Sequence, residues 1–522
     1  MSYKREHYLL PVVLIIAAIF RFWQIDQPFV DSVSWRQSDT ATIAINFYRG
    51  NWNILLPQIS WNGPEPNYVG YEFQTITYIA AMIFKVFGVH NWLYRLIPIL
   101  FSLVGIFSFY KITQLVWDKK HAAISALILA ILPGNVYVDR SFLPDPVMLA
   151  LVTTSAYLFL VYLRTDRTSL LAGASILATL GFLTKVPGIF VGIPMLYAAR
   201  TILSRRGKLN LKAFIPIVIA SVLVVLPVIC YYFWAIYISH NYYPYYIAAG
   251  GYWIWKFGLS EWLDNKFFIV ELGKHLWVYW TEFIVFLVLL GIFIRPDIKG
   301  EESDSPSIQV TWFFHIWMLA FGLYYLIAAK GLVANPTNLN LMFPAAAALA
   351  GAALLKVFYF FQSRWGVSFA KVFLIIFFVV FSLVGFHRIG KRSYYPFSQN
   401  GYELGIALRE ISKPNDLVVT IADVGEDPVA IHYSERRGWT FLPLFSWPEK
   451  SWDLWFSGSS GITDVEAIDL LEELRERNVS WLGIVKQQIE GIQKERPVLA
   501  EYLADTFQLY IENDTFSIYR FR

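Results

Sequence analysis

The 522-residue chain is poor in cysteine and in charge. Its one cysteine, Cys230, lies in an apolar run, so no intrachain disulfide is possible and the redox compartment cannot be inferred. Only 16% of the residues are charged, against about 25% in soluble domains. The net charge of +4 is too small to indicate nucleic-acid binding. With 56% hydrophobic residues, the composition predicts an integral membrane protein.

Long apolar runs predict about eleven membrane-spanning helices, since a helix needs about 20 apolar residues to cross a bilayer. The first run is followed by no small-residue cleavage site, so we expect an uncleaved span rather than a signal peptide. The predicted spans cover residues 8–23, 94–116, 121–138, 146–163, 168–183, 187–203, 212–238, 276–294, 309–329, 340–360 and 368–386.

A shorter apolar run, residues 75–88, is predicted to lie in the membrane interface. It carries Lys85, and runs of this length are typical of interfacial helices. Lysine and arginine accumulate in cytoplasmic loops. If this run does not cross, every short basic loop lies on the side of the N-terminal Lys-Arg-Glu sequence. These loops are residues 117–121, 164–167, 204–208, 295–299 and 362–366.

Residues 31–72 then form a long outer loop that is rich in tryptophan and in carboxylates. Ordered loops of this length usually have a function. Asp39 or Asp31 is a candidate general base or cation ligand; the structural alternative is a solvated carboxylate paired with Arg36. Glu72 either favours the dipole of the helix after it or lies beside the base, as an orienting group or a metal ligand.

Further polar residues are predicted on the same outer face. Asp145 precedes a proline at the outer end of a span and is either a helix N-terminal acid or a site residue. Asp139 and Arg140 are expected to form a local ion pair. Lys185 lies between two apolar runs; it either extends its ammonium to the interface or binds a phosphate as a point charge.

From about residue 394 the composition predicts a soluble α/β domain. Residues 417–423, 481–485, 507–513 and 516–521 have the β-branched and aromatic content of strands. Residues 427–437 and 463–478 have helical spacing and helix-start signals. We find no Gly-rich phosphate loop, no metal-ligand spacing and no nucleophile elbow in this region. The predicted domains are residues 1–393, a transmembrane domain, and residues 394–522, an extracytoplasmic α/β domain.

Three short patterns, in a fixed order, carry a resemblance to a known family. The first is an outer-loop acid followed by Gly-Asn-Trp and Pro. The second is a Glu that opens a short helix, then Phe-Gly and Arg. The third is an Arg and an Asp-Pro, followed one span later by Leu-Thr-Lys and Pro. They occur at Gly50, Asn51, Trp52 and Pro57; at Glu72, Phe87, Gly88 and Arg95; and at Arg140, Asp145, Pro146, Leu183, Thr184, Lys185 and Pro187.

In these patterns the chain resembles the membrane C-type glycosyltransferases, the family of the dolichyl-phosphate-mannose–protein mannosyltransferases and the lipid A aminoarabinose transferase. One branch of the family has a lysine where this chain has Phe73, so Lys185 or Arg36 is expected to compensate. The resemblance implies a polyprenyl-phosphate sugar donor, a lipid, glycan or protein acceptor, and inversion at the sugar. It also implies a bacterial or archaeal plasma membrane location with an extracytoplasmic active site.

The roles that the resemblance implies fall on seven residues. Asp39 or Asp31 serves as the base and Asp145 is a further catalytic carboxylate, while the substrate-binding residues are Arg36, Glu72, Arg140 and Lys185. A divalent cation on Asp39 and Glu72 stays open. A transporter or lipid flippase is the alternative, although no internal repeat and no deeply placed charge in a span supports it. A membrane-anchored sensor would leave the long first loop and Asp145 unexplained.

Overall fold

The computed structural model describes residues 8–50, 52–64, 66–207, 211–247, 253–264, 266–296, 308, 310–423, 427–441 and 463–521. The chain forms two units. The first comprises Met1–Ile25, Arg95–Tyr232 and Ala249–Arg392, and the second comprises Asp26–Tyr94, Phe233–Ala248 and Ser393–Arg522. Two of the boundaries between the units fall within the residue ranges of α4 (Asn91–Val116) and α10 (Leu211–Asn241).

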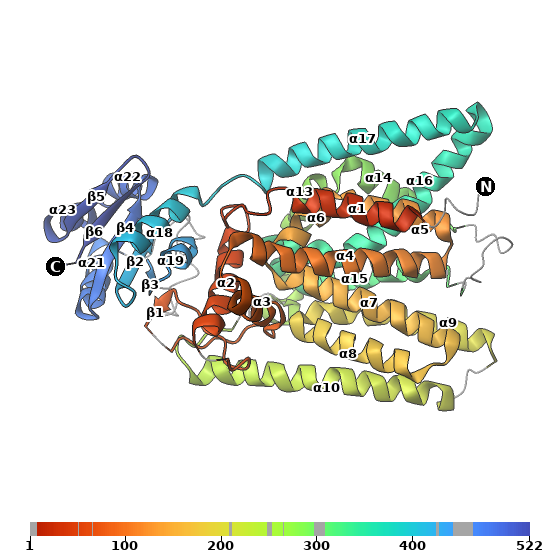
Figure 1. Cartoon of the computed structure of the whole chain (residues 1–522), viewed down its shortest axis with the longest axis horizontal. Coiled ribbons are helices and arrows are strands. Elements are labelled where there is room, and N and C mark those ends of the chain that lie inside the picture. The colour runs from red at the N-terminus through yellow and green to blue at the C-terminus, as the bar shows by residue number, and fades with distance from the viewer. Residues whose placement is uncertain are drawn as a thin grey trace. The chain divides into compact units, whose positions relative to one another are not determined.

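The first unit is helical (Figure 1). Besides α4 and α10 it contains α1 (Leu9–Phe22), α5 (Lys119–Ile131), α6 (Pro133–Arg140), α7 (Pro144–Thr165), α8 (Thr168–Thr184), η2 (Val186–Val191), α9 (Gly192–Arg205), α11 (Ile254–Phe257), α12 (Leu259–Asp264), α13 (Phe267–Tyr279), α14 (Thr281–Ile292), α15 (Phe313–Ala334), η3 (Pro336–Met342), α16 (Phe343–Trp365) and α17 (Val367–Arg392).

Among the described residues, seven helices are long and apolar enough to cross a membrane, and nine spans result if two bent helix pairs each count as one. The predicted spans at 121–138 and 276–294 fall on these bent pairs, α5–α6 and α13–α14, which bend by 62° and 111°. The predicted spans at 8–23 and 168–183 are helices of only 14 and 17 residues, α1 and α8. By length and composition, the described residues therefore contain fewer candidate membrane spans than the roughly eleven predicted from the sequence.

Proline explains the first of these bends. Leu132 has an extended backbone, with φ −60° and ψ 116°, and Pro133 is the first residue of α6. A proline disfavours the helical conformation in the residue before it and supplies no amide proton to continue the helix. The break separates Asp139 and Arg140, on α6, from the straight part of the span.

The alanine-rich helix α16 forms the centre of the first unit. Every residue of its first half, from Phe343 to Leu355, is buried, because small side chains let neighbouring helices approach closely. A Cβ at Gly351 would lie 2.3 Å from Ser125 Oγ of α5, and one at Gly291 of α14 would lie 2.3 Å from the Leu349 carbonyl oxygen. Only glycine fits at these two contacts without a shift.

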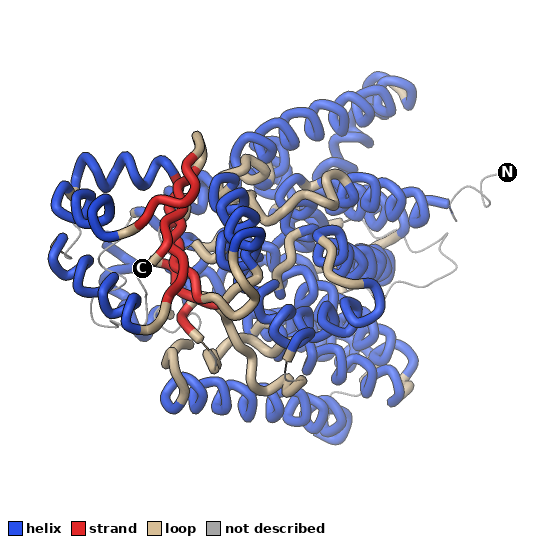
Figure 2. Tube along the Cα trace, turned by 60° about the vertical axis from the view of Figure 1, so that its left-hand side comes forward, coloured by secondary structure: helices blue, strands red, loops and turns tan. Residues whose placement is uncertain are grey.

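The second unit is built on a six-stranded sheet with the order β1-β3-β2-β4-β6-β5. Strands β3, β2 and β4 are parallel, and β1, β6 and β5 are antiparallel to their neighbours. Helices cover both faces of the sheet (Figure 2). Its elements are α2 (Ser34–Arg49), β1 (Asn62–Gly63), α3 (Thr75–Phe87), α18 (Gln399–Ile411), β2 (Leu417–Ile421), α19 (Val429–Ser434), β3 (Arg437–Thr440), α21 (Asp464–Glu476), β4 (Val479–Val485), α22 (Lys486–Glu495), α23 (Pro497–Thr506), β5 (Gln508–Glu512) and β6 (Phe516–Arg520).

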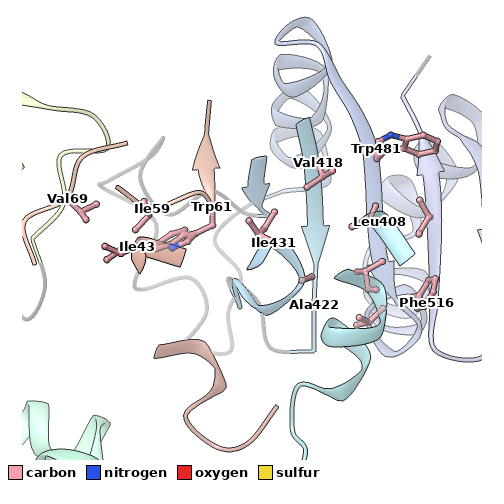
Figure 3. Close-up of a cluster of buried hydrophobic side chains, with 14 of the residues drawn as sticks. Ile43, Ile59, Trp61, Val69, Leu408, Val418, Ala422, Ile431, Trp481 and Phe516 are labelled. Carbon is pink, nitrogen blue, oxygen red and sulfur yellow. The ribbon is translucent and has the colours of Figure 1, made fainter. Parts of the chain in front are cut away.

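The loop of residues 31–72 contributes a strand to this sheet. Asn62 and Gly63 of β1 pair with Trp439 and Gly438 of β3. One apolar cluster joins the loop to the tail: Ile43 of α2 and Trp61 lie in the same core as Leu408, Val418, Ala422, Ile431, Trp481 and Phe516 (Figure 3). Hydrogen-bonded strands must lie on one side of a membrane, so the loop and the tail share a side.

Most of the tail elements follow the sequence pattern, with one shortened helix. The strands expected near 417–423 and 516–521 are β2 and β6, and helix α21 begins with the capping box of Thr463 and Glu466. The helix expected over 427–437 ends at Ser434, because Glu435 takes the left-handed conformation with φ 56° and Arg437 begins β3.

Helix α3 has the length of an interfacial helix. Its 13 residues span about 20 Å at 1.5 Å per residue, less than the roughly 30 Å of a hydrocarbon core. Ile76, Ala80 and Phe84 are buried within the second unit, while Val86 and Phe87 are exposed. This length is compatible with the interfacial position predicted for the helix.

Candidate functional site

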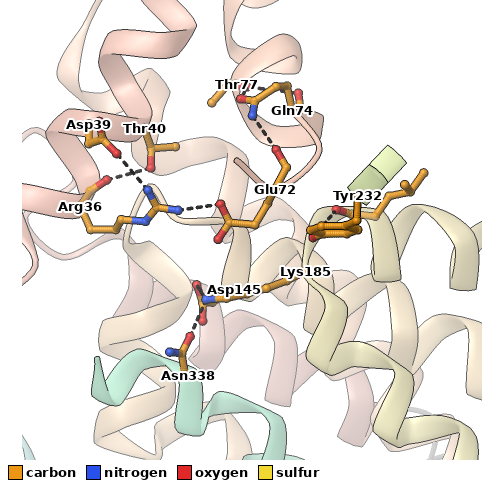
Figure 4. A network of polar contacts seen from close by, with 11 residues as sticks. Arg36, Asp39, Thr40, Glu72, Gln74, Thr77, Asp145, Lys185, Tyr232 and Asn338 are labelled. Carbon is orange, nitrogen blue, oxygen red and sulfur yellow. Dashed lines mark hydrogen bonds and ion pairs between the residues drawn. The ribbon is translucent and has the colours of Figure 1, made fainter. Parts of the chain in front are cut away.

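Helix α2 and the loop before α3 bring three of the predicted site residues together. Arg36 donates one hydrogen bond to Asp39 Oδ2 at 2.9 Å and a second to Glu72 Oε2 at 2.7 Å. The guanidinium also lies 4.6 Å from the centre of the Tyr71 ring. Figure 4 shows Arg36 between the two carboxylates. Residues 36 and 39 are one helical turn apart, so α2 itself places the first pair.

Asp39 is fully buried, and its two oxygens have different partners. Oδ2 accepts from Arg36, and Oδ1 accepts from the indole N–H of Trp61 at 2.8 Å. Burial raises the pKa of Asp39 above its ordinary value, because the surroundings disfavour the charged form; Arg36, Tyr71 and Trp61 oppose the shift. A raised pKa makes the carboxylate a stronger proton acceptor. The Glu72 side chain, by contrast, is 19% exposed.

The other candidate base, Asp31, has local partners. Its Oδ1 accepts from Gln37 Nε2 at 2.8 Å and from the Val33 amide at 3.2 Å, and its carbonyl accepts from the Ser34 amide. These contacts hold the turn that leads into α2. The structure therefore brings Asp39, Arg36 and Glu72 together, whereas Asp31 stabilises the turn before α2.

The Arg36 group does not fit a metal ion shared by Asp39 and Glu72. The guanidinium lies between the two carboxylates and bonds to both. Among the described residues there is also no group of three or more histidine, cysteine, aspartate or glutamate side chains that could hold a metal.

In the first unit, the structure joins Lys185 to Asp145. Lys185 Nζ donates to Asp145 Oδ2 at 2.7 Å and also to Asn338 Oδ1 of η3 (Figure 4). Asp145 opens α7 and is 1% exposed, while Lys185 caps α8 at its C-terminal end. Asp145 Oδ1 and the third N–H of Lys185 have no partner among the residues that the structure describes. Asp145 Oδ1 can therefore accept a further hydrogen bond, and Lys185 Nζ can donate one.

Arg140 and Asp139 do not form the ion pair that the sequence suggested. Asp139 Oδ2 instead accepts from Nε and Nη2 of Arg21, at 3.0 and 2.7 Å, and from Asn135 at 2.8 Å. Arg140 is fully buried and donates to the Gln24 carbonyl at 2.6 Å. Adjacent residues on a helix point in different directions, so α6 presents the two side chains to different partners. The Arg21–Asp139 pair links α1 to α6.

Five residues of these groups were not anticipated: Trp61, Tyr71, Asn338, Arg21 and Asn135. Trp61 and Tyr71 lie within the aromatic loop that the sequence singled out, but nothing in their spacing separates them from its other aromatic residues. Asn338 lies in an Asn-rich stretch before α16. Polar residues next to a membrane helix often belong to a functional site, so this stretch could have been predicted as part of one. The same reasoning applies to Arg21, at the end of the first apolar run.

Comparisons with known proteins support the resemblance. A sequence model described as dolichyl-phosphate-mannose-protein mannosyltransferase matches residues 75–234, which include Asp145 and Lys185 but not Asp39. A search of curated proteins finds no significant match. The structure of ArnT from Cupriavidus metallidurans bound to undecaprenyl phosphate is similar with a TM-score of 0.61 and 11% identity, covering 100% of this chain and 98% of ArnT.

Two structures of the Archaeoglobus fulgidus oligosaccharyltransferase are also similar. The complex with Zn and sulfate has a TM-score of 0.59 and 15% identity, covering 97% of this chain and 72% of that one. The AglB complex with an inhibitory peptide and a dolichol-phosphate has a TM-score of 0.60 and 13% identity, covering 99% and 74%. The chain thus has the fold of these C-type glycosyltransferases and resembles, over residues 75–234, the dolichyl-phosphate-mannose-protein mannosyltransferase family.

Proposed function

We propose that this chain is an integral membrane glycosyltransferase that moves a sugar from a polyprenyl-phosphate donor to a hydroxyl or amine of an acceptor. The resemblance over residues 75–234 supports the reaction class. Two proteins of the same fold were solved with undecaprenyl phosphate and dolichol-phosphate, which supports the donor class. The observation that carries the proposal is the Arg36–Asp39–Glu72 group, in which the buried Asp39 carboxylate has a raised pKa.

Asp39 is the proposed base. An acceptor O–H replaces the Arg36 N–H on Oδ2, and the proton passes to the carboxylate as the acceptor oxygen attacks the sugar carbon. Arg36 stays held by Glu72 when it leaves Asp39, so the exchange leaves no buried charge without a partner. The bond from the sugar carbon to the phosphate oxygen breaks, and the anomeric centre inverts. Asp31 is less suited, because its oxygen holds the turn before α2.

Lys185 is the proposed source of positive charge for the leaving phosphate. Its third N–H is available to a phosphate oxygen, and Asp145 and Asn338 fix the direction of the ammonium. Charge fixed in advance, where negative charge develops, lowers the barrier without reorganisation during the reaction. Asp145 thus orients Lys185, and Glu72 orients Arg36; Arg140 holds the backbone at Gln24.

The proposed orientation of the chain in the membrane is based on the positive-inside rule, which puts the short basic loops on the cytoplasmic side. In this proposal residues 1–393 form the transmembrane domain and residues 394–522 an extracytoplasmic α/β domain. The β1–β3 pairing supports a shared side for the first loop and the tail. The active site then faces the extracytoplasmic side of a plasma membrane.

Substitution of the two candidate bases tests the proposal. The purified protein is supplied with a radiolabelled polyprenyl-phosphate sugar and its release of polyprenyl phosphate is measured. Asp39→Asn should lower turnover by about 10²–10⁴-fold, the range of a lost general base. Asp31→Asn and the exposed control Asp505→Asn should lose less than tenfold. Normal turnover in Asp39→Asn would contradict the assignment of Asp39 as the base. Uptake of the donor without its cleavage would indicate a transporter and not an enzyme.

A further inference from the structure

Helix α3 leaves an apolar face outside the core of the second unit. Its buried residues include Ile76, Ala80 and Phe84. Met82 and Val86 lie one turn apart on the opposite side of the helix and are 48% and 74% exposed. Exposed apolar patches of this kind mark contact with a protein or a membrane. The large apolar side chains of this patch, which we call the α3 surface, are Met82, Val86, Phe87, Val89 and Trp92.

Lys85 places a positive charge on the α3 surface. It follows Met82 by one helical turn and directly precedes Val86, so the three side chains share one side of the helix. Its ammonium lies 5.1 Å from the centre of the Tyr48 ring and 5.6 Å from the centre of the Trp52 ring. Aromatic faces attract a cation, but its N–H groups can still donate to an oxygen. Lys85 forms no ion pair with a carboxylate of the described residues.

The two rings under the ammonium are themselves held in place. Tyr48 packs edge-on against Phe84, with the ring centres 6.2 Å apart. Trp52 packs edge-on against Tyr78 at 5.5 Å, and the Tyr78 hydroxyl donates to the Trp52 carbonyl at 3.1 Å. The aromatic loop therefore fixes where the positive charge of Lys85 lies, beside apolar side chains that are exposed.

A cation among exposed apolar side chains matches an anionic phospholipid. A lysine at a membrane surface extends its ammonium to the headgroup level, where the phosphate lies. The acyl chains supply the apolar environment that the α3 surface lacks in water. The rings of His90 and Trp92 are stacked 6.3 Å apart at the end of the same surface, and tryptophan is typical of the membrane interface. Since residues 75–88 are predicted to lie in that interface, these features favour a lipid over a protein partner.

We propose that the α3 surface binds an anionic phospholipid of the bilayer, with the headgroup phosphate on Lys85 and the acyl chains on Met82, Val86 and Phe87. The binding depends on the proposed interfacial position of α3 and not on glycosyl transfer. The donor lipid is a different molecule, since its phosphate is assigned to Lys185 in the first unit. The bound phospholipid holds α3, the helix that follows Glu72, at the membrane surface.

A fluorescent label beside Lys85 measures this binding directly. The exposed Cys230 is replaced in a Cys230→Ser background, and Val89→Cys then carries an environment-sensitive label. The full-length protein in detergent is titrated with dioctanoyl phosphatidylglycerol, dioctanoyl phosphatidylcholine and glycerol phosphate. Phosphatidylglycerol should bind at least about fivefold more tightly than phosphatidylcholine, the effect of one lysine at a membrane surface. Glycerol phosphate, which has no acyl chains, should leave the label unchanged.

Lys85→Gln is the decisive variant, because it keeps the length and polarity of the side chain and removes only its charge. The affinity for phosphatidylglycerol should fall to that for phosphatidylcholine, and Lys85→Arg should retain the preference. Lys111→Gln is the matched control, since Lys111 of α4 also lies over a ring, 5.7 Å from the centre of Phe107; it should leave the titration unchanged. Circular dichroism and the thermal midpoint check the fold of each variant.

Four results would overturn the inference. They are equal affinities for the two phospholipids, an unchanged preference in Lys85→Gln, glycerol phosphate binding as tightly as phosphatidylglycerol, and a label response that follows protein concentration without added lipid, which would indicate a protein partner. Displacement of phosphatidylglycerol by an equal amount of undecaprenyl phosphate would also overturn it, by assigning the surface to the donor lipid. Asp39→Asn separates this proposal from the proposed function, because it should lose transfer and bind phosphatidylglycerol as the wild type does.

Discussion

Breaking the Lys185–Asp145 pair should destabilise the first unit by a predictable amount. The charges are 2.7 Å apart, and the side chains are 14% and 2% exposed. At an effective dielectric constant near 20, two unit charges at this distance attract by about 6 kcal/mol. Desolvation offsets part of this. Lys185→Met leaves the Asp145 carboxylate buried without a cation, which should cost about 3–5 kcal/mol of unfolding free energy.

The double variant Asp145→Asn/Lys185→Met should recover most of this loss, because no lone charge is left. A double-mutant cycle should then give a coupling energy of about 2–3 kcal/mol. Glycosyl transfer should stay lost in both variants, since the charge for the leaving phosphate is gone. Recovered stability without recovered transfer would show that Lys185 does more than hold the fold.

The assay is denaturant unfolding of the purified protein in detergent, followed by tryptophan fluorescence, with donor cleavage measured on the same samples. Lys274→Met is the matched control: Lys274 is 65% exposed and pairs with Glu271 on the surface of α13. Its loss should cost less than about 1 kcal/mol. A Lys185→Met variant that is no less stable than Lys274→Met, or a double variant as unstable as the single one, would refute the buried-pair argument.

Three further outcomes follow from burial and packing. Burial raises the pKa of Asp427 to about 7, so the folded state holds a proton that the unfolded state releases above about pH 3.9. Asp427→Asn should therefore be more stable than wild type at pH 8, by at most about 4 kcal/mol, with no difference at pH 3. Burial lowers the pKa of His432 to about 4, which has the opposite effect on the pH dependence of stability. The wild type loses stability as the pH falls from about 6.5 toward 4, because the unfolded state then binds a proton that the folded state does not. The His432→Asn variant should lose up to about 3 kcal/mol less over this pH range. Thermal midpoints between pH 3 and pH 8 check both slopes, and a slope unchanged in either variant contradicts its assignment. Gly291→Ala, which meets a backbone carbonyl at 2.3 Å, should cost about 1–3 kcal/mol, whereas Gly322→Ala, with nothing within 4 Å, should gain up to about 1 kcal/mol; equal effects would argue against the close contact between α14 and α16.

The sequence predicted much of the fold because its signals are local. Apolar length places most of the long helices, and β-branched runs place β2 and β6. Helix breaks were missed where one residue decides the geometry, as at Pro133, since an apolar run looks continuous across it. Strand β1 was missed for another reason: Asn62 and Gly63 have no strand pattern, and only their pairing with β3 makes them a strand.

For the candidate site, the sequence identified the charged residues but not their partners. Asp39, Arg36 and Glu72 stood out as polar groups in an aromatic loop, and one turn of α2 brings the first two together. Asn338 and Arg21 come from segments far away in the chain, so no spacing rule links them to Lys185 or Asp139. The pairing expected between Asp139 and Arg140 was wrong, because adjacent residues on a helix do not face each other.

The release of polyprenyl phosphate by the purified wild-type chain tests the central claim most directly. A radiolabelled polyprenyl-phosphate sugar is incubated with the protein and an acceptor extract, and the lipid and the glycosylated product are separated and identified by mass spectrometry and NMR. The account predicts free polyprenyl phosphate in amounts equal to the product, with the sugar linkage inverted. A donor that stays intact while the protein moves it or another solute across vesicles would contradict the account.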